Sequence, residues 1–413
     1  MSGRPAVLFL AHRIPYPPDK GEKIRALNIV ERLAERFDVH LAAFVDEPAD
    51  FAGREALAAR VASLSLFRLE RRFAAVRSAA GFVSRQALTF PYFRDARMAR
   101  RVAEIRASPL AAEIAFSSSM APYIREGGRA ARLVDLCDSD AEKWRQYAAR
   151  AEWPLRAVYA REARRLAEAE TAILNWADAA FAATRAEAAI LNARPGVRRP
   201  AIVLANGVDT EHFRPNAERS APERGGDVVF VGRMDYRANV DAVLHFARAV
   251  WPKVRMVRPA RFAVVGAGPP REVRALDGAD GVAVVGRVDD VRPYLQHAAL
   301  AVAPLRIARG VQNKVLEAMA MARPVVASPA AAEGIDAAPG TELVVADGED
   351  AFAAAILALL ADRKRGDAIG ASARARVKAD YSWRARLAPL DAALDRLSGA
   401  SDPERASGPA SPG

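Results

Sequence analysis

The sequence predicts an α/β protein built from two doubly wound parallel-sheet domains that face a cleft. Three observations predict this fold class. The chain has 413 residues, more than a single hydrophobic core usually organises. Short apolar runs alternate with longer stretches of helical periodicity along most of its length. A polar stretch at 214–227 separates two series of this alternation, as an inter-domain linker does.

Seven apolar runs in the first half of the chain predict β-strands. They lie at Ala6–Ala11, Val39–Val45, Ser65–Leu69, Glu113–Ser117, Arg132–Leu136, Ala179–Ala183 and Ile202–Ala205. Runs of this kind, with helical patterns between them, are typical of strands in a parallel sheet. Helices are expected at Ile24–Arg36, where apolar residues recur at roughly helical spacing, and at about 155–175.

The alternation is more regular in the second half. Strands are expected at Val228–Val231, Phe262–Val265, Val282–Val285, Leu300–Ala303, Pro324–Ala327 and Glu342–Val345. Helices are expected near Val240–Val250, Val291–Gln296, Lys314–Met321 and Ala351–Leu360. The alternation therefore predicts a second sheet of the same kind as the first.

These patterns divide the chain into a first domain at 1–213, a linker at 214–227 and a second domain at 228–380. A helix at 381–398 is expected after the second domain, with the first domain as a surface on which it packs. The tail at 399–413 has low complexity and is expected to be disordered.

The net charge of +11 invites a nucleic-acid interpretation, but no zinc-finger spacing or RNA-binding aromatic signature accompanies it. We therefore expect no nucleic-acid partner. The segment Phe51–Leu110 holds twelve Arg against four acidic residues, with apolar residues among them. Such a surface fits anionic lipid, and a plain solvated surface is the alternative. No apolar run is long enough to span a membrane, and Cys137 is the single cysteine. We expect a cytoplasmic protein, with a peripheral place on the inner face of the membrane as an option.

Ligands of parallel sheets bind beyond the carboxyl ends of the strands, so residues that follow strands carry the functional information. Gly266 and Gly268 follow a strand in the run VVGAGP, which lacks the third glycine of a dinucleotide fingerprint. A glycine turn that approaches a nucleotide and an ordinary strand-to-helix turn both fit this run. Gly232 and Arg233 follow another strand, and an Arg there is suited to binding a diphosphate.

A third group of residues gives the strongest signal, in the segment from Pro304 to Ser328. Its order is strand, glycine-containing loop and helix N-terminus. Free N–H groups at Gly310–Asn313 and the helix dipole favour an anion, and Lys314 adds a positive charge. Glu317, expected in the first helical turn, is an acceptor suited to ribose hydroxyls. A carboxylate that merely stabilises the helix dipole is the alternative.

The first half offers a separate group of candidates. His12, Lys20 and Gly21 lie in the loop that follows the first strand, and Asp138 and Asp140 follow the strand RLVDLC. We expect all five to face the cleft from the first domain, with His12 and Asp138 as catalytic or substrate-orienting groups. The alternatives are a strand-end histidine bonded to the backbone and a helix N-cap at Asp138 or Ser139.

The run NKVLEAMA followed by PVVAS, with FVGRM, VVGAGP and GRVDDVRPYL before it, resembles the family 4 retaining glycosyltransferases of GT-B fold, which has two Rossmann-like domains. ANGVDTEHF at Ala205–Phe213 looks like the inter-domain crossing of that family. More narrowly, PYPPDKGEKIRA, DSDAEKWRQYA, GRMDYRANVDAV and RGVQNKVLEAMA resemble the sugar transferases associated with PEP-CTERM/exosortase systems.

The resemblance implies which residues bind the nucleotide diphosphate sugar. Arg233 would contact the diphosphate and Glu317 the ribose, and Arg233 and Lys314 would assist departure of the diphosphate. Residues implied to hold the sugar and phosphates are Arg309, Gly310, Val311, Gln312, Asn313 and Lys314. Residues implied to lie along the base are Gly286, Arg287 and Val288.

The sequence departs from the family pattern at two positions. The family usually has a Lys five residues after the Arg of its Gly-Arg motif, and Ala238 stands there. The family also has a Glu eight residues before the position of Glu317, where this chain has Arg309. Our hypothesis is that Lys314 and Arg309 supply the positive charge that is missing at Ala238.

The resemblance implies transfer of a hexose-type sugar to an acceptor hydroxyl with retention, without cofactor or metal. In this class the departing diphosphate takes the proton of the acceptor, so no pair of glycosidase carboxylates is needed. A lipid-linked or polysaccharide acceptor is expected, in exopolysaccharide assembly. The alternatives are a nucleotide-sugar epimerase of similar fold and a non-catalytic module that binds nucleotide sugar or membrane. An NAD-linked oxidoreductase is not expected, because this sequence lacks the complete glycine fingerprint that such an enzyme needs.

Overall fold

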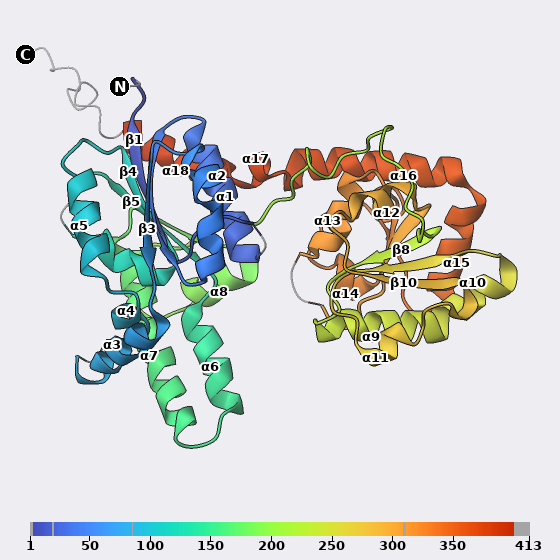
Figure 1. Cartoon of the computed structure of the whole chain (residues 1–413), viewed down its shortest axis with the longest axis horizontal. Coiled ribbons are helices and arrows are strands. Elements are labelled where there is room, and N and C mark those ends of the chain that lie inside the picture. Colours follow the sequence, from blue (N-terminus) through green and yellow to red (C-terminus); the bar gives the residue numbers. More distant parts are fainter. Residues whose placement is uncertain (1–2, 19, 85, 127, 309–310, 400–413) are drawn as a thin grey trace, which may run out of the picture. The chain divides into compact units, whose positions relative to one another are not determined.

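The computed structural model describes residues 3–18, 20–84, 86–126, 128–308 and 311–399. The chain forms two units (Figure 1). The first comprises the chain up to Asn206 and resumes at Arg386, and the second is Gly207–Ala385. In the first unit the side chains of residues 80, 83, 150, 398 and 399 are outside the description.

The first unit is built on a parallel sheet of order β3-β2-β1-β4-β5-β6-β7. Its strands are β1 Ala6–Ala11, β2 Asp38–Val45, β3 Ser63–Arg68, β4 Ala112–Phe116, β5 Ala131–Cys137, β6 Ala179–Ala182 and β7 Ile202–Val203. Val7 of β1 pairs with Val39 on one side and Ala112 on the other. The central strands β1 and β4 are buried, which explains the continuous apolar sequence of β1. β4 also buries Glu113, which pairs with Arg106 at 2.6 Å.

Helices cover both faces of this sheet (Figure 1). They are α1 Gly21–Ala34, α2 Arg54–Ala58, α3 Arg71–Val83, α4 Thr89–Tyr92, α5 Ala96–Ile105, α6 Asp140–Arg150, α7 Leu155–Trp176, α8 Arg185–Asn192 and α18 Ala388–Gly399, with 3₁₀ turns at Pro48–Gly53 and Ser118–Tyr123. α18 returns to this unit, where Arg32 of α1 donates to Asp391 at 3.0 and 2.8 Å.

The second unit has a six-stranded parallel sheet of order β10-β9-β8-β11-β12-β13. Its strands are β8 Val228–Val231, β9 Phe262–Val265, β10 Val282–Gly286, β11 Leu300–Ala303, β12 Val325–Ala327 and β13 Val344–Val345. Its helices are α9 Arg237–His245, α10 Trp251–Val257, α11 Arg271–Arg274, α12 Arg292–His297, α13 Asn313–Ala320, α14 Pro329–Ala332, α15 Glu349–Ala361 and α16 Arg363–Arg376, with a 3₁₀ turn at Ala279–Gly281; α17, Trp383–Arg386, ends at the unit boundary. The buried core includes Phe230, Phe246, Trp251 and Phe262.

All thirteen expected strands are present. The bounds of β1, β8, β9 and β11 are those expected, and the others differ by one or two residues at an end. The helix expected at Val240–Val250 begins earlier, at Arg237, and passes through a π-helical turn at Phe246–Val250 before α10. The chain crosses between units at 206/207 and 385/386 rather than within 214–227. The latter segment belongs to the second unit, where the N–H of Asn216 donates to Gln296 at 2.9 Å. Across the described residues, no helix combines the length and apolar character that crossing a membrane requires.

Candidate active site

The order of the second sheet creates a switch point between β8 and β11. The chain leaves these neighbouring strands toward opposite halves of the sheet, so the loops that follow them diverge and leave room for a ligand. Arg233 follows β8, and the loop that leads to α13 follows β11. Both segments singled out in the sequence therefore lie at the position where this fold binds ligands.

Three glycines join the ends of β8, β9 and β10. The N–H of Gly232 donates to Val265 at 2.9 Å, and the N–H of Gly266 donates to Gly286 at 2.8 Å. A Cβ on Gly266 would lie 1.9 Å from the carbonyl oxygen of Gly232, and its φ of +154° also favours glycine. These amides are used within the protein, so Gly232 and Gly266 serve strand-end packing.

Arg233 and Gly268 lie on adjoining loops. The Nε of Arg233 is 3.2 Å from an oxygen of Asp235, and this pairing lowers the pKa of the Asp235 carboxyl. A Cβ on Gly268, which has φ +74°, would approach Asp235 to 3.6 Å. The guanidinium of Arg233 is largely exposed, so it is accessible to a ligand.

Asn239 connects the Arg233 loop to the helix that carries Lys314. The side chain of Asn239 is buried in the first turn of α9, where its Nδ2 donates to the carbonyl oxygen of Arg233 at 2.7 Å. Its Oδ1 accepts a hydrogen bond from the Nζ of Lys314. The same ammonium lies 5.0 Å from the centre of the Phe230 ring, a cation–π distance. Lys314 thereby contacts the residue that follows Ala238, the position at which the family pattern has its Lys.

Lys314 and Glu317 are both perturbed by burial. Burial lowers the pKa of Lys314 to about 8, although the carboxylate of Glu317 opposes the shift. Burial raises the pKa of Glu317 to about 7, opposed by Lys314. Because α13 begins at Asn313, Glu317 lies in its second turn and not in the first, which argues against a simple dipole role. Perturbed pairs of this kind gather at functional sites.

The remaining donor-side candidates divide into three groups. Arg309 and Gly310 lie outside the described residues. Gln312 is the N-cap residue of α13 and Asn313 its exposed first residue, whereas Val311 packs against the core. Past β10, Arg287 is exposed and Val288 packs against the core.

The first sheet has its own switch point, between β1 and β4, and His12 follows β1 there. The His12 ring stacks on Phe116 with centroids 5.8 Å apart, and its Nδ1 is 3.4 Å from the Phe116 carbonyl oxygen. Burial, and then the charge of Arg13, lower the pKa of His12, so the imidazole is neutral at pH 7. Its contact with the backbone is long, so the ring is held mainly by stacking.

Three serines after β4 complete this edge. Ser117 has φ +84°, rare for a residue with a side chain, and the buried Ser118 donates to Asp140 at 2.8 Å. The Nζ of Lys143 is 3.4 Å from the other oxygen of Asp140. Ser118 and Lys143 were not among the predicted residues, although the run Ser117–Ser119 directly after a strand was a usable signal.

Ser139, not Asp138, caps α6, because its hydroxyl accepts from the N–H of Glu142 at 3.0 Å. Asp138 is exposed just before this cap, so the N-cap alternative does not apply to it. Ser139 also donates to the buried Glu170 at 3.2 Å, and Glu170 accepts from the N–H of Ala141 at 3.0 Å. The start of α6 is therefore held in place by hydrogen bonds to Glu170 of α7.

The contacts found for Lys20 and Gly21 do not involve His12. Lys20 pairs with Glu47 at 2.7 Å, and Gly21 is the first residue of α1 with open space around it. Arg13, next to His12, forms a two-fold hydrogen bond with Asp46 at 3.1 and 2.9 Å. The structure thus brings together His12 and Asp140, whose charge acts on the His12 ring.

Residues 225–362 match the family model of glycosyl transferases group 1. The second unit matches a glycosyltransferase domain. The match covers the switch point, Arg233, Asn239, Lys314 and Glu317. A comparison with curated protein sequences finds no significant match.

Solved structures share the fold along most of this chain. HepE from Anabaena in complex with UDP has 13% identity and a TM-score of 0.63, covering 95% of this chain and 100% of that one. Sucrose-phosphate synthase from Thermosynechococcus elongatus has 18% identity and a TM-score of 0.63, covering 96% and 100%. HepE has also been solved with UDP-glucose, and that structure has 14% identity and a TM-score of 0.62, covering 94% and 99%. The chain therefore has the GT-B fold, and the domain match with this fold supports a glycosyltransferase.

Proposed function

We propose that the protein is a retaining glycosyltransferase that moves a sugar from a nucleotide diphosphate sugar to an acceptor hydroxyl. The observation that carries the proposal is the joining of Arg233 and Lys314 through Asn239 at the switch point of the second sheet. Two cations at the carboxyl ends of strands, one on each side of that point, suit a diphosphate. HepE, whose fold is similar along nearly the whole chain, has been solved in complex with UDP and with UDP-glucose.

Each donor-side residue has a distinct proposed role. Arg233 and Lys314 neutralise the charge that develops on the departing diphosphate. Glu317 accepts hydrogen bonds from the ribose. The amides at the start of α13, with the neighbouring Arg309 and Gly310, hold the sugar and phosphates. Gly286, Arg287 and Val288 border the base.

On the acceptor side, His12, Asp138 and Asp140 orient the reacting hydroxyl, with Ser118 fixing Asp140. Lys20 and Gly21 border the acceptor. A neutral His12 accepts a hydrogen bond from the hydroxyl without adding charge. The departing diphosphate takes the acceptor proton on the same face of the sugar, so retention needs no nucleophilic carboxylate and no metal. Chelation with EDTA is expected to leave turnover unchanged.

The biological acceptor proposed here is a lipid-linked or polysaccharide glycan in exopolysaccharide assembly, at the inner face of the cytoplasmic membrane. The resemblance to sugar transferases of exosortase systems supports this role, and so does the basic surface at Phe51–Leu110.

Calorimetry with a panel of nucleotide sugars, followed by product analysis with lipid-linked acceptors, tests the proposal. We expect one donor to bind and its sugar to appear on the acceptor with unchanged anomeric configuration by NMR. A rearranged nucleotide sugar without any acceptor would identify an epimerase. Binding without turnover across a broad acceptor panel would identify a non-catalytic module.

The site itself is tested by Lys314→Ala against Lys364→Ala. Lys364 is an exposed residue of α16 in the same unit, so it reports on the loss of a positive charge alone. We expect Lys314→Ala to weaken donor binding and turnover and Lys364→Ala to change neither. Equal turnover in both variants would contradict the role given to Lys314.

A further inference from the structure

The helix α3 buries the small side chain of Ala74 and presents its large apolar side chains outward. Phe73 and Val76 are 69% and 73% exposed, whereas the polar side chains of Arg77 and Ser78 face the body of the first unit. Arg77 donates to the carbonyl oxygen of Tyr92 at 3.2 Å, and Ser78 donates to that of Leu88 at 2.8 Å. A surface helix ordinarily buries its apolar stripe. The exposed apolar face of α3 is therefore available to contact a membrane or another protein.

The C-terminal end of α3 is held against α7. Arg161 of α7 donates to the carbonyl oxygen of Gly81 at 2.6 Å and stacks over the ring of Phe82 at 4.9 Å. The buried carboxylate of Glu162, the next residue, accepts from the N–H groups of Leu88 and Thr89. The outward face of α3 is therefore a fixed part of the unit, beside α7.

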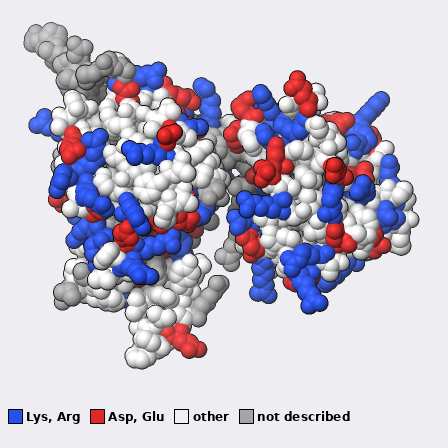
Figure 2. Space-filling view, viewed as in Figure 1, with Lys and Arg blue, Asp and Glu red and all other residues white. Residues whose placement is uncertain are grey.

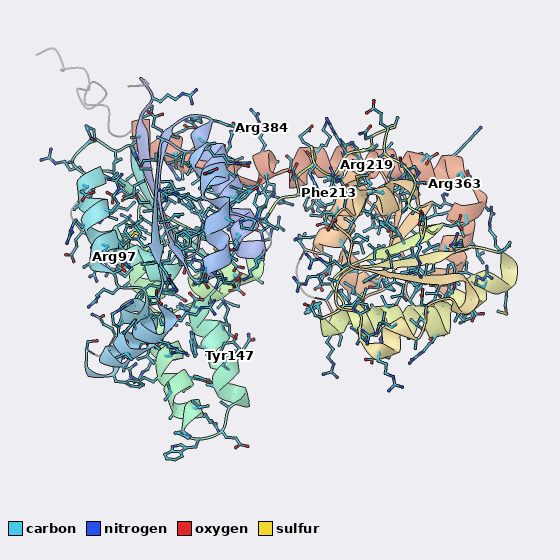
Figure 3. All side chains as sticks on the ribbon, in the orientation of Figure 1. Arg97, Tyr147, Phe213, Arg219, Arg363 and Arg384 are labelled. Atoms are coloured by element: carbon cyan, nitrogen blue, oxygen red, sulfur yellow. The ribbon has the colours of Figure 1, made fainter. Side chains whose placement is uncertain are left out.

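The hairpin formed by α6 and α7 carries a second apolar group at its free end, which extends away from the sheet (Figure 1). Trp153, between the two helices, is 84% exposed, and Leu155 and Tyr147 are exposed as well. Tyr147 lies on α6 toward that end (Figure 3). The Trp144 ring packs on Tyr147 and Tyr159, with centroids 5.7 and 5.2 Å apart, which fixes the two helices together.

Exposed arginines lie at the start of α3 and in the segment that follows it in the chain. Arg71 and Arg72 are the first two residues of α3, and Arg94, Arg97 and Arg100 lie on α5 or just before it. Arg71 pairs with Asp46 and Arg97 with Asp95. Blue side chains gather over this part of the first unit, whereas the hairpin below it is mostly white (Figure 2). Exposed apolar side chains among Arg are the composition that anionic bilayer surfaces bind, and Trp is enriched at the bilayer interface.

We propose that the outward face of α3 and the tip of the α6–α7 hairpin together dock the first unit on an anionic lipid bilayer. The apolar residues stand on two projecting elements rather than in a pocket, so they suit insertion among lipid headgroups. Arg72, next to Phe73 on α3, and the exposed Arg94 and Arg100 of the same unit supply the charge complementarity to anionic lipid. The other end of the hairpin begins at Ser139 and Asp140, so docking brings a lipid-linked acceptor toward the loop after β5. This last step rests on the function proposed above.

The docking is tested by sedimentation of the full chain with vesicles of phosphatidylcholine containing phosphatidylglycerol, and with vesicles of phosphatidylcholine alone. We expect binding to the anionic vesicles at low salt, weaker binding as salt rises, and little binding to neutral ones. Phe73→Ser with Val76→Ser, and separately Trp153→Ser, should each weaken anionic binding about tenfold or more. Arg72→Glu should weaken it and reduce its salt dependence.

Met256→Ser is the matched control, because Met256 is 80% exposed on α10 of the second unit. It should bind vesicles like the unchanged protein. Because every substituted side chain is exposed, we expect each variant to fold, and thermal melts check this.

Two results overturn the proposal: vesicle binding equal in all folded variants, and loss of self-association rather than of lipid binding in the α3 and Trp153 variants, which would identify a contact between copies of the chain. Turnover with a water-soluble acceptor separates this proposal from the enzymatic one. If the docking proposal alone fails, the α3 and Trp153 variants bind vesicles like the unchanged protein, and turnover persists. If the enzymatic proposal alone fails, the unchanged protein binds anionic vesicles but shows no turnover.

Discussion

Asn239 accepts a hydrogen bond from Lys314 on one side and donates to the backbone of Arg233 at 2.7 Å on the other. One buried amide therefore positions both cations that we assign to the diphosphate. Asn239→Ala removes the contact with Lys314 and leaves the carbonyl oxygen of Arg233 without this donor. A loss of this kind is worth about 1–3 kcal/mol, which corresponds to donor binding weaker by about 5- to 150-fold. Calorimetry of donor binding measures it.

Asn216→Ala is the control for that variant, since Asn216 lies in the same unit and contacts Gln296 through its backbone. Its donor affinity should match that of the unchanged protein. Equal affinity in both variants would show that Lys314 and Arg233 need no shared support.

Donor affinity should pass through a maximum between pH 7 and 8. The carboxyl of Glu317 has a pKa of about 7 and accepts ribose hydrogen bonds best when ionised, so affinity rises through that pH. Lys314 has a pKa of about 8, and its ammonium attracts the diphosphate, so affinity falls above that pH. In Lys314→Arg the charge persists and the fall should disappear. A fall that remains in this variant would assign it to another group.

Glu317→Gln should stabilise the unliganded protein at pH 8. Burial raises the pKa of Glu317 from its ordinary 4.5 to about 7, so the folded state favours the protonated carboxyl. Stability is therefore lost as pH rises from about 4.5 to 7, and Gln does not bear this cost. The melting temperature of the variant should exceed that of the unchanged protein at pH 8 and approach it at pH 4.5. A constant difference at all pH values would point to packing instead.

Gly266→Ala should destabilise the second unit strongly, because its Cβ would lie 1.9 Å from the carbonyl oxygen of Gly232. Gly278→Ala is the matched control, with φ +82° and no atom within 4 Å of its Cβ. It bears only the cost of a left-handed backbone, roughly 1–2 kcal/mol. The difference between the two unfolding free energies, from urea titration, measures the clash. Equal effects would mean that β8 and β9 separate without cost.

Features written in local sequence were predictable, and features that depend on distant partners were not. The run Phe262–Val265 predicts a strand by itself, and Arg233 and Lys314 stand out because they follow strands. Asn239 looks like any helical residue until Lys314, 75 positions later, is folded onto it. On α3 the sequence indicates a basic amphipathic surface. The inward direction of Arg77 depends on the carbonyl group of Tyr92, which helical periodicity does not reveal.

The return of α18 to the first unit has a consequence for biosynthesis. The second unit, Gly207–Ala385, is one continuous segment, whereas the first unit contains both the N-terminal segment and residues from Arg386 onward. During translation the second unit can therefore complete its core while the first still lacks the partner of Arg32, which is Asp391. The first unit therefore cannot form the Arg32–Asp391 pair until α18 has been made. A released chain truncated before Ala388 should accordingly show greater protease resistance in the second unit than in the first.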